Sequence, residues 1–339
     1  MTSTSDESRS LAGLTAPQAG PHPGMERAFR PGGMTLGVTT PLEGFAGALP
    51  HMSRHAELVE QAEKAGFATV WVRDVPLVDP KYGDAGQMFD AFTYLGYLAA
   101  RTTTITLGTA GIVLPLRHPI DVAKAAASVD QLSGGRLLLG VATGDRAIEF
   151  PAYGVDYASR GELFRESVSW LRELAGDHPR ISSTLGRMDG TDLVPKPFAR
   201  RMPLFMTGRG QQDIEWIATN TNGWLFYTVP IEQQALNIKR WRRLTGRADG
   251  IFKPFLQATY FDITDDSTAK PQPIQLGMRL GREPLLELLQ RWEQIGVDQL
   301  FINFKQSTRP VTEVLHEIEE HILPHFPAGQ TAALTRPMP

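Results

Sequence analysis

The 339-residue chain contains no cysteine, which excludes disulfide bonds, thiolate catalysis and cysteine-ligated metal sites. It also lacks an apolar run long enough to cross a bilayer. Its formal net charge of -3 gives no electrostatic reason to expect a nucleic acid or an anionic membrane as partner. These absences favour a cytoplasmic protein.

Groups that act directly as catalysts are scarce as well. No carboxylate pair indicates a glycosidase, no nucleophile has a matching base, and no HExxH-type cluster indicates a metal. The glycine-rich turns do not form a G-x-G-x-x-G fingerprint after the first strand. No lysine follows a strand in position to form a Schiff base, which disfavours a sugar-phosphate aldolase or isomerase. The sequence therefore predicts no metal site.

What the chain does contain is a regular alternation of apolar strands and amphipathic helices, with 42% hydrophobic residues. Strands are predicted over residues 34–39, 68–72, 104–107, 137–141, 203–206, 223–226, 255–261 and 299–303. Helices are predicted over 51–65, 87–100, 119–132, 160–174, 211–219, 231–244, 285–296 and 311–323. This alternation favours an α/β fold of the (β/α)8 TIM barrel type, with short insertions, over an open doubly wound sheet.

The two ends of the chain differ from its middle. Residues 1–33 are rich in Ser, Thr, Gly and Pro, without a sustained apolar period and without the pattern of a signal peptide. We predict a disordered N-terminal leader over 1–33, with Met25 as an alternative start. The barrel is expected over 34–327 and a C-terminal tail over 328–339.

Functional residues of such a barrel follow the carboxyl ends of its strands. Those positions carry mostly hydroxyl groups, glycines and backbone, with few ionisable side chains. They are Thr39 and Thr40, Arg73 and Asp74, Thr109–Gly111, Thr143–Asp145, Thr207–Gly210, Tyr227 and Thr228, and Asn303. A site of this kind suits an organic cofactor that brings its own chemistry.

Two glycine-containing turns are candidates for cofactor contacts. The turn 207–211 lies between a strand and a helix expected to begin near Gln211, where free N–H groups and Arg209 would favour a phosphate. A tight turn with a solvated arginine explains these residues equally well. Residues 108–111 could form a bulge that approaches a ligand ring, although a loose strand end is the simpler interpretation.

Three side chains each have two interpretations. Asp74 could accept a hydrogen bond from a ligand or pair with Arg73, and the ion pair is the commoner outcome. His118, just before Pro119, is expected at a helix start with its ring satisfied by backbone, rather than as a base. Trp224 lies in a predicted strand and could face the pocket.

The stretch LGTAGIVLPLRHPIDVAKAAASVDQLSGGRLLLGVATGDRAIEFPAYGVDYASRGELFRES resembles the bacterial luciferase-like flavin monooxygenases, a family of (β/α)8 oxidoreductases. AEKAGFATVWVRD before it, and MTGRGQQDIEWIA and WEQIGVDQLFINF after it, support the resemblance. The similarity spans roughly residues 34–326, which is most of the chain. It implies that the protein is an enzyme and that it forms a homodimer.

The resemblance also implies roles for individual residues. Thr109, Ala110 and Gly111 match the bulge that supports the flavin ring, often through a non-prolyl cis peptide. The other cofactor-binding matches are Thr143 and Gly144 at the ring, Tyr157 and Arg160 toward the ribityl phosphate, and Thr207, Gly208 and Arg209 at the phosphate turn. Asp74 and His118, with Arg73, are the nearest candidates for catalytic proton transfer.

The implied reaction uses reduced FMN and O2 to oxidise a small organic substrate, with NAD(P)H acting indirectly through a flavin reductase. A deazaflavin that transfers hydride without oxygen is the alternative, which extra basic residues at the rim, such as Arg200, Arg201 and Arg209, would favour. A flavin-binding protein without turnover is a third hypothesis. Segment 262–281 is shorter than the mobile insertion of the luciferases, so light emission is not implied and the substrate stays open.

Overall fold

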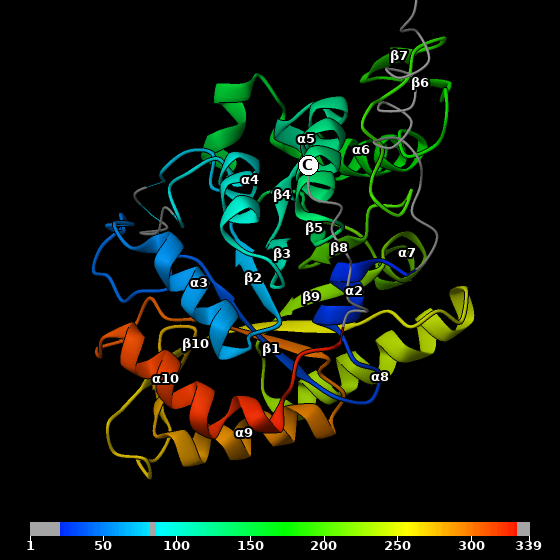
Figure 1. Ribbon diagram of the computed structural model, residues 1–339. Coiled ribbons are helices and arrows are strands. Elements are labelled where there is room, and N and C mark those ends of the chain that lie inside the picture. Colours follow the sequence, from blue (N-terminus) through cyan, green and yellow to red (C-terminus); the bar gives the residue numbers. More distant parts are fainter. Residues whose placement is uncertain (1–20, 80, 82–85, 331–339) are drawn as a thin grey trace, which may run out of the picture.

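Eight parallel strands close into a barrel in the computed structural model, which describes residues 21–79, 81 and 86–330 (Figure 1). The strands are β1 (Thr35–Thr39), β2 (Thr69–Val72), β3 (Thr106–Thr109), β5 (Leu137–Ala142), β8 (Leu204–Thr207), β9 (Gly223–Tyr227), β10 (Phe255–Ile263) and β13 (Gln299–Asn303). Each strand pairs with the next, and the pairing of β1 with β13 places Thr35 opposite Gln299 and Thr39 opposite Asn303. This last pairing closes the ring, so the predicted TIM barrel is confirmed.

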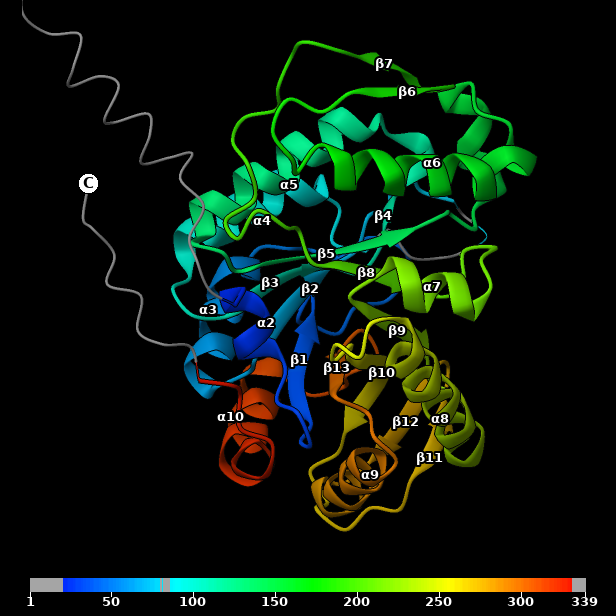
Figure 2. The same cartoon turned by 90° about the vertical axis from the view of Figure 1, so that its right-hand side faces the viewer.

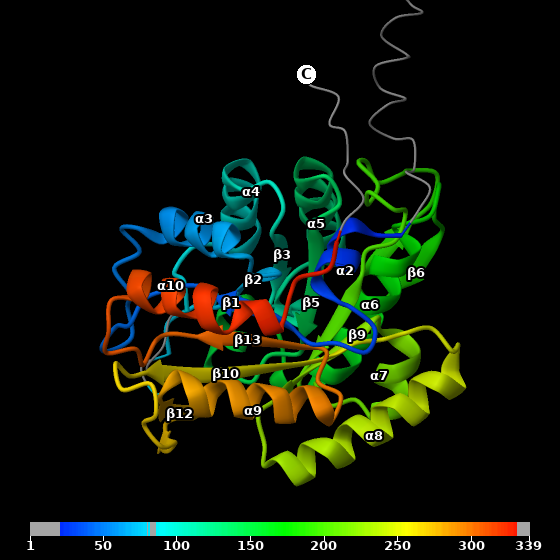
Figure 3. The ribbon, with the colours of Figure 1, turned by 60° about the horizontal axis from the view of Figure 1, so that its bottom comes forward.

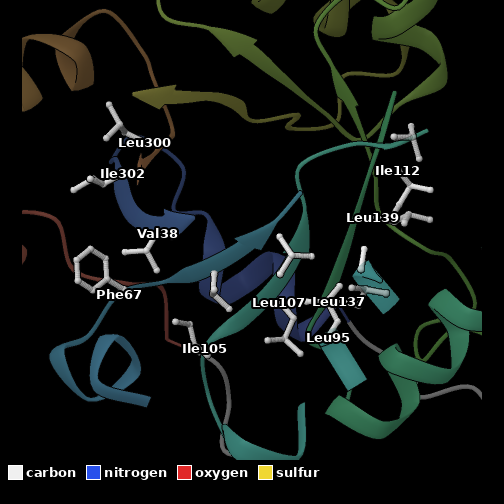
Figure 4. Close-up of a cluster of buried hydrophobic side chains, with 14 of the residues drawn as sticks. Val38, Phe67, Leu95, Ile105, Leu107, Ile112, Leu137, Leu139, Leu300 and Ile302 are labelled. Carbon is white, nitrogen blue, oxygen red and sulfur yellow. The ribbon is translucent and has the colours of Figure 1, made fainter. Parts of the chain in front are cut away.

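Helices surround the barrel and bury the outward face of its strands. They are α3 (His55–Ala65), α4 (Ala91–Arg101), α5 (Pro119–Ser133), α6 (Arg160–Glu173), α7 (Ile214–Asn220), α8 (Ile231–Ala248), α9 (Arg282–Gln294) and α10 (Val311–His321), with short 3-10 helices η1 (Leu114–Leu116), η2 (Ala147–Tyr153), η3 (Tyr157–Ser159) and η4 (Leu323–His325). Alternate strand residues such as Val38 and Leu107 meet helix residues such as Leu95 in this core (Figure 4). Continuously apolar strands are therefore explained by burial on both faces.

The barrel interior is a second, smaller core made by the inward residues of the same strands. Its members include Trp71, Leu138, Phe205, Leu225, Leu256 and Phe301. The large rings fit because glycines stand opposite them: a methyl group at Gly108 would lie 2.3 Å from the Trp71 ring. Trp71 donates its indole N–H to Gln299 Oε1 at 2.9 Å, which satisfies its polar atom inside the barrel. Side chains fill the interior of the barrel, as in other eight-stranded barrels.

Three additions decorate the barrel. β4 (Ile112–Val113) pairs with the upper half of β5 after a break in β3. The hairpin of β6 (Ile181–Ser183) and β7 (Gly186–Met188) lies beside α6 (Figure 2), and the indole of Trp170 on α6 donates to Ser183 Oγ at 2.8 Å. A further hairpin, β11 (Gln272–Ile274) and β12 (Gly277–Leu280), extends β10.

Residues 21–33 differ from the expected leader. They contain α2 (Pro23–Ala28), which lies under the amino-terminal ends of the strands, where Gly24 N–H donates to Gly135 O at 2.9 Å. His22 is buried beside Asp130, with Nε2 and Oδ1 3.2 Å apart. Phe29 reaches the barrel interior and stacks on Phe205. The leader prediction is therefore wrong for 21–33, because this short segment buries its apolar residues although it has no long apolar period; residues 1–20 lie outside the described part of the chain.

The expected tail also begins later than predicted. Gly329 is buried, and its N–H donates to Arg27 O at 2.9 Å, so residues 328–330 pack against α2. The remaining tail residues, 331–339, are outside the described region. No helix among the described residues is long and apolar enough to span a membrane.

Candidate functional site

The carboxyl ends of β3, β5, β8 and β9 bring most of the predicted cofactor residues into one contiguous region, which we call the mouth. A methyl group at Gly111 would lie 3.1 Å from Ala142 Cβ and 3.2 Å from Thr207 Cβ. A methyl group at Gly210 would lie 3.1 Å from Thr143 Cγ2. The residues predicted from three separate turns are therefore neighbours, as the parallel topology requires.

Residues Thr109–Gly111 form the bulge between β3 and β4. Thr109 Oγ1 donates to Gly140 O at 2.8 Å, and Ala110 N–H donates to Val72 O at 2.7 Å, so both neighbouring strands hold the bulge. Gly111 has a φ of 120°, which a side chain would strain. The expected non-prolyl cis peptide is wrong: the cis bonds of the described chain both precede proline, at Thr40-Pro41 and Val194-Pro195.

Asp74 supports this bulge from the end of β2. Its carboxylate accepts from Val113 N–H at 3.1 Å and from Arg117 Nη2 at 2.7 Å, and its side chain is 2% exposed. Arg117 also reaches the more exposed Asp90 at 3.2 Å. Burial opposes the charge of Arg117, but the hydrogen bond and attraction from Asp74, and then those from Asp90, raise its pKa. Asp74 thus pairs with Arg117, which the sequence did not indicate, and its carboxylate holds the backbone of Val113.

Replacing Asp74 by asparagine is expected to lower the free energy of unfolding by about 1–3 kcal/mol, because Arg117 would lose its buried carboxylate. Asp90→Asn is the matched control, since it removes the exposed arm of the same guanidinium. That change is expected to cost less than about 1 kcal/mol, because exposed ion pairs contribute little. Urea unfolding of both variants provides the comparison, and equal losses would contradict the positioning role of Asp74.

His118 is a helix-entry residue, as the local sequence favours. Its Nδ1 lies 3.3 Å from the Ile120 N–H and accepts from it, capping α5. Its Nε2 lies 3.1 Å from Leu185 O in the β6–β7 turn, and its ring meets Trp170 edge-on. Both ring nitrogens are therefore engaged by backbone. The catalytic role expected for His118 is not supported, because neither nitrogen is left to exchange a proton with a ligand at the mouth.

The turn from Thr207 to Gln211 has left-handed backbone at three positions, a conformation that lets a turn wrap around a bound anion. Gly208, Gly210 and Gln211 have φ values of 66°, 50° and 58°. The following helix α7 begins at Ile214, later than predicted, because the Asp213 side chain caps it by accepting from Trp216 N–H at 2.6 Å. The helix amino terminus is thus occupied by a carboxylate. Positive charge at the turn must come from arginine instead.

Arg209 and Arg160 supply that charge. The side chain of Arg209 is exposed and has no hydrogen-bond or ion-pair partner within the described part of the chain. Arg160 stacks on Tyr157, with Cζ 3.6 Å from the ring centroid, and donates to Tyr157 O at 2.7 Å. With the Gln211 amide oxygen turned toward it, Arg160 Nη2 also donates to Gln211 at 2.9 Å. The predicted phosphate residues therefore converge on one side of the mouth.

Trp224 supports this turn from behind and does not face the mouth. Its side chain is fully buried and packs against Trp241 and Phe255 on the outer face of the barrel. The indole N–H donates to Gly208 O at 2.6 Å, which fixes the turn. The expectation that Trp224 faces the pocket is wrong, because Gly223 and Leu225 take the inward positions of β9.

Hydroxyl groups at the carboxyl ends of β1 and β8 have unused hydrogen-bonding capacity. Within the described chain, the buried Oγ1 atoms of Thr39, Thr40 and Thr207 have no partner. A buried polar atom without a partner costs free energy unless a ligand or water meets it. Donors of this kind, next to glycines that allow close approach, fit the polar edge of a flavin-type ring.

Arg146 and Glu149 are mouth-side residues that the sequence reasoning missed. Both are buried, and Glu149 Oε1 lies 3.9 Å from Arg146 Nη1 and 3.4 Å from Leu77 N–H. Burial raises the pKa of Glu149 above its usual value, and the Arg146 charge opposes that rise. Their i, i+3 spacing is a sequence signal that could have indicated the pair. The contact of Glu149 with Leu77 N–H connects η2 to the segment after β2.

Arg200 and Arg201, in contrast, lie outside the mouth. They precede β8, so they are at the amino-terminal end of that strand, and Arg200 pairs with Asp177 at 2.6 Å. Of the three arginines expected to favour a deazaflavin tail, only Arg209 lies at the mouth, and Arg160 lies there as well.

Comparison with known proteins identifies the family of this chain. The family model described as luciferase-like monooxygenase matches residues 32–270. An F420-dependent hydroxymycolic acid dehydrogenase of Mycobacterium tuberculosis is 30% identical over 63% of this chain and 58% of its own length. The alkanal monooxygenase alpha chain of Aliivibrio fischeri is 27% identical over 46% of this chain and 43% of that chain. The chain thus spans less than two thirds of either relative.

Solved structures agree on the fold. A monooxygenase from Streptomyces bottropensis superposes with a TM-score of 0.72 at 19% identity, covering 86% of this chain and all of that one. The family match covers more than half of the present chain, including β1 to β9 and the whole of the mouth described above. The chain therefore belongs to the luciferase-like monooxygenase family.

Proposed function

We propose that the protein is an oxidoreductase that binds a phosphorylated flavin-type cofactor at the mouth. The observation that carries this proposal is the convergence of the Thr109–Gly111 bulge, Thr143 and the Thr207–Gln211 turn beside unpaired buried hydroxyls. Such a cofactor, when bound and reduced, supplies the electrons for the reaction. The chain itself contributes binding, orientation and exclusion of water.

Each part of the mouth has a distinct task in this proposal. Thr39, Thr40 and Thr207 offer hydroxyl donors to the polar edge of the ring. Gly111 and the bulge let backbone approach the ring face, with Asp74 holding the bulge in place. The phosphate would lie at the turn, where Arg209 is unpaired and Arg160 is held by Tyr157.

We propose FMN as the first cofactor and an O2-using monooxygenase as the first reaction, with a flavin reductase supplying the reduced form. Arg160 and Arg209 provide positive charge for one phosphate group, which suits FMN. A deazaflavin hydride-transfer enzyme is the second candidate, and the F420-dependent relative supports it. The substrate in either case is a small organic molecule.

Arg209→Ala is expected to weaken FMN binding by roughly 10–100-fold, because a charge-assisted contact of about 1.5–3 kcal/mol is lost. Riboflavin, which has the same ring without the phosphate, should bind the variant and the wild type equally. Titration by flavin fluorescence measures both ligands, and Arg187→Ala on the exposed β6–β7 hairpin is the control variant. An equal loss for riboflavin would show that Arg209 does not act through phosphate.

The two candidate reactions separate under defined conditions. Titration with FMN and with coenzyme F420 ranks the cofactors, and failure of both to bind would contradict the proposal. Consumption of O2 by the reduced complex in the presence of substrate supports the monooxygenase. Anaerobic reduction of the deazaflavin by an alcohol supports hydride transfer. Stoichiometric binding without turnover in either assay would favour a non-catalytic flavin carrier.

A further inference from the structure

A second concave site lies at the opposite end of the barrel from the mouth. This cleft has a volume of 380 Å³ and is enclosed by the end of α6, the start of β8, the α7–β9 connection and the α8–β10 connection. Figure 3 shows α6, α7 and α8 on this side of the molecule. Its volume is within the range of small-molecule sites.

Positive charge dominates the polar part of the cleft. Lys253 is buried and already satisfied, since Nζ donates to Ala218 O at 2.6 Å and pairs with Asp249 at 2.9 Å. Arg172 donates through Nη1 to Asn220 Oδ1 at 2.7 Å, a neutral partner that leaves its charge uncompensated. The cleft therefore keeps a net positive charge after its internal pair is counted.

Arg201 adds a second uncompensated guanidinium beside Arg172. It is exposed at the cleft and has no hydrogen-bond or ion-pair partner in the described part of the chain. Burial lowers the pKa of Arg172, and the neighbouring charge of Arg201 lowers it further. Two like charges at one cavity repel, and a bound anion would reduce that repulsion.

The rest of the wall is apolar. Leu171, Ala175, Met202, Leu204 and Ile251 line it. Ile251 is 60% exposed and offers apolar surface at the edge of the cleft. A ligand that satisfies both parts of the wall carries an anionic head and a short apolar body.

We propose that this cleft is a second binding site, for a small organic phosphate whose anionic head lies between Arg172 and Arg201 and whose apolar part lies on Met202 and Ile251. The site is separate from the proposed cofactor site, because Leu204 at the start of β8 lines the cleft whereas Thr207 at its end belongs to the mouth. The inference does not depend on the identity of the cofactor.

Hexyl phosphate and inorganic phosphate are the probes. Isothermal titration of the full chain at constant ionic strength should show hexyl phosphate binding at least about tenfold more tightly than phosphate, because the apolar wall contributes. Arg201→Gln should weaken hexyl phosphate by about tenfold or more through loss of the charge-assisted contact. Among the described residues the Arg201 side chain has no partner to lose, so this variant is expected to fold normally.

Two controls locate the binding. Arg54→Gln removes an exposed arginine on the other side of the barrel, next to α3, and should leave the affinity unchanged. Arg209→Ala removes the charge at the mouth and should also leave it unchanged, although it weakens FMN. Equal affinities for wild type and Arg201→Gln would overturn the proposal, and so would a loss confined to Arg209→Ala. Binding of inorganic phosphate alone, without a gain from the hexyl chain, would contradict the apolar part of the site.

Discussion

Gly140→Ala is expected to lower the free energy of unfolding by about 2–4 kcal/mol and to weaken FMN binding by about tenfold or more. The added methyl group would lie 1.9 Å from Thr109 O and 3.3 Å from Gly111 N. These atoms belong to backbone, so the clash cannot be relieved by rotating a side chain. The bulge would have to move away from β5, and Thr109 would lose its hydrogen bond to Gly140 O.

Gly96→Ala is the matched control for this change. Gly96 lies inside α4, and a methyl group there would meet nothing within 4 Å. Alanine is favoured over glycine in a helix, so the control should gain about 0.5–1 kcal/mol and bind FMN normally. Urea unfolding and flavin titration measure both effects. Wild-type stability and affinity in Gly140→Ala would contradict the described packing of the bulge.

Arg136→Met should lower the free energy of unfolding by about 3–5 kcal/mol while leaving the cofactor affinity of the folded protein unchanged. Arg136 is buried, and its guanidinium donates to the carbonyl oxygens of Ala99, Thr102, Ile105 and Ser133. Methionine has a similar length but no donor, so these carbonyls would be left unpaired between α4 and the start of β5.

Arg136→Lys provides the graded comparison, because an ammonium group can satisfy some of the same carbonyls. Its loss should lie between the wild type and Arg136→Met in chemical unfolding. The contrast with Gly140→Ala tests the division of the barrel into a stability end and a functional end. Loss of FMN affinity in folded Arg136→Met would contradict that division.

Sequence reasoning succeeded where local pattern and topology agree. The alternation of apolar strands with helices required a parallel sheet, and parallel strands bring their carboxyl ends together. That is why the sequence indicates that Thr109–Gly111, Thr143 and Thr207–Arg209 lie at one end of the barrel. The turn glycines were equally informative, because Gly111, Gly208 and Gly210 all adopt the positive φ values that glycine permits.

The sequence was less informative where a partner is far away along the chain. Arg117 lies 43 residues after Asp74, and no local pattern connects them. The start of α7 was misplaced although Asp213 is a preferred capping residue, because the glycines before it suggested an earlier start. α2 was missed because its six residues are too few to show a helical period. α2 is buried because it packs under the amino-terminal ends of the strands, so its burial depends on residues far away along the chain.

The contact of Arg27 with Gly329, together with the β1–β13 pairing, bears on how the protein is made. β13, the pairing partner of β1, emerges from the ribosome long after β1 itself. Until then, the nascent protein carries an incomplete sheet with two open edges, and its interior aromatic rings lack their final cover. Folding during synthesis therefore cannot close the barrel before β13 emerges, and the chain is exposed to misassembly for longer than one built from local contacts.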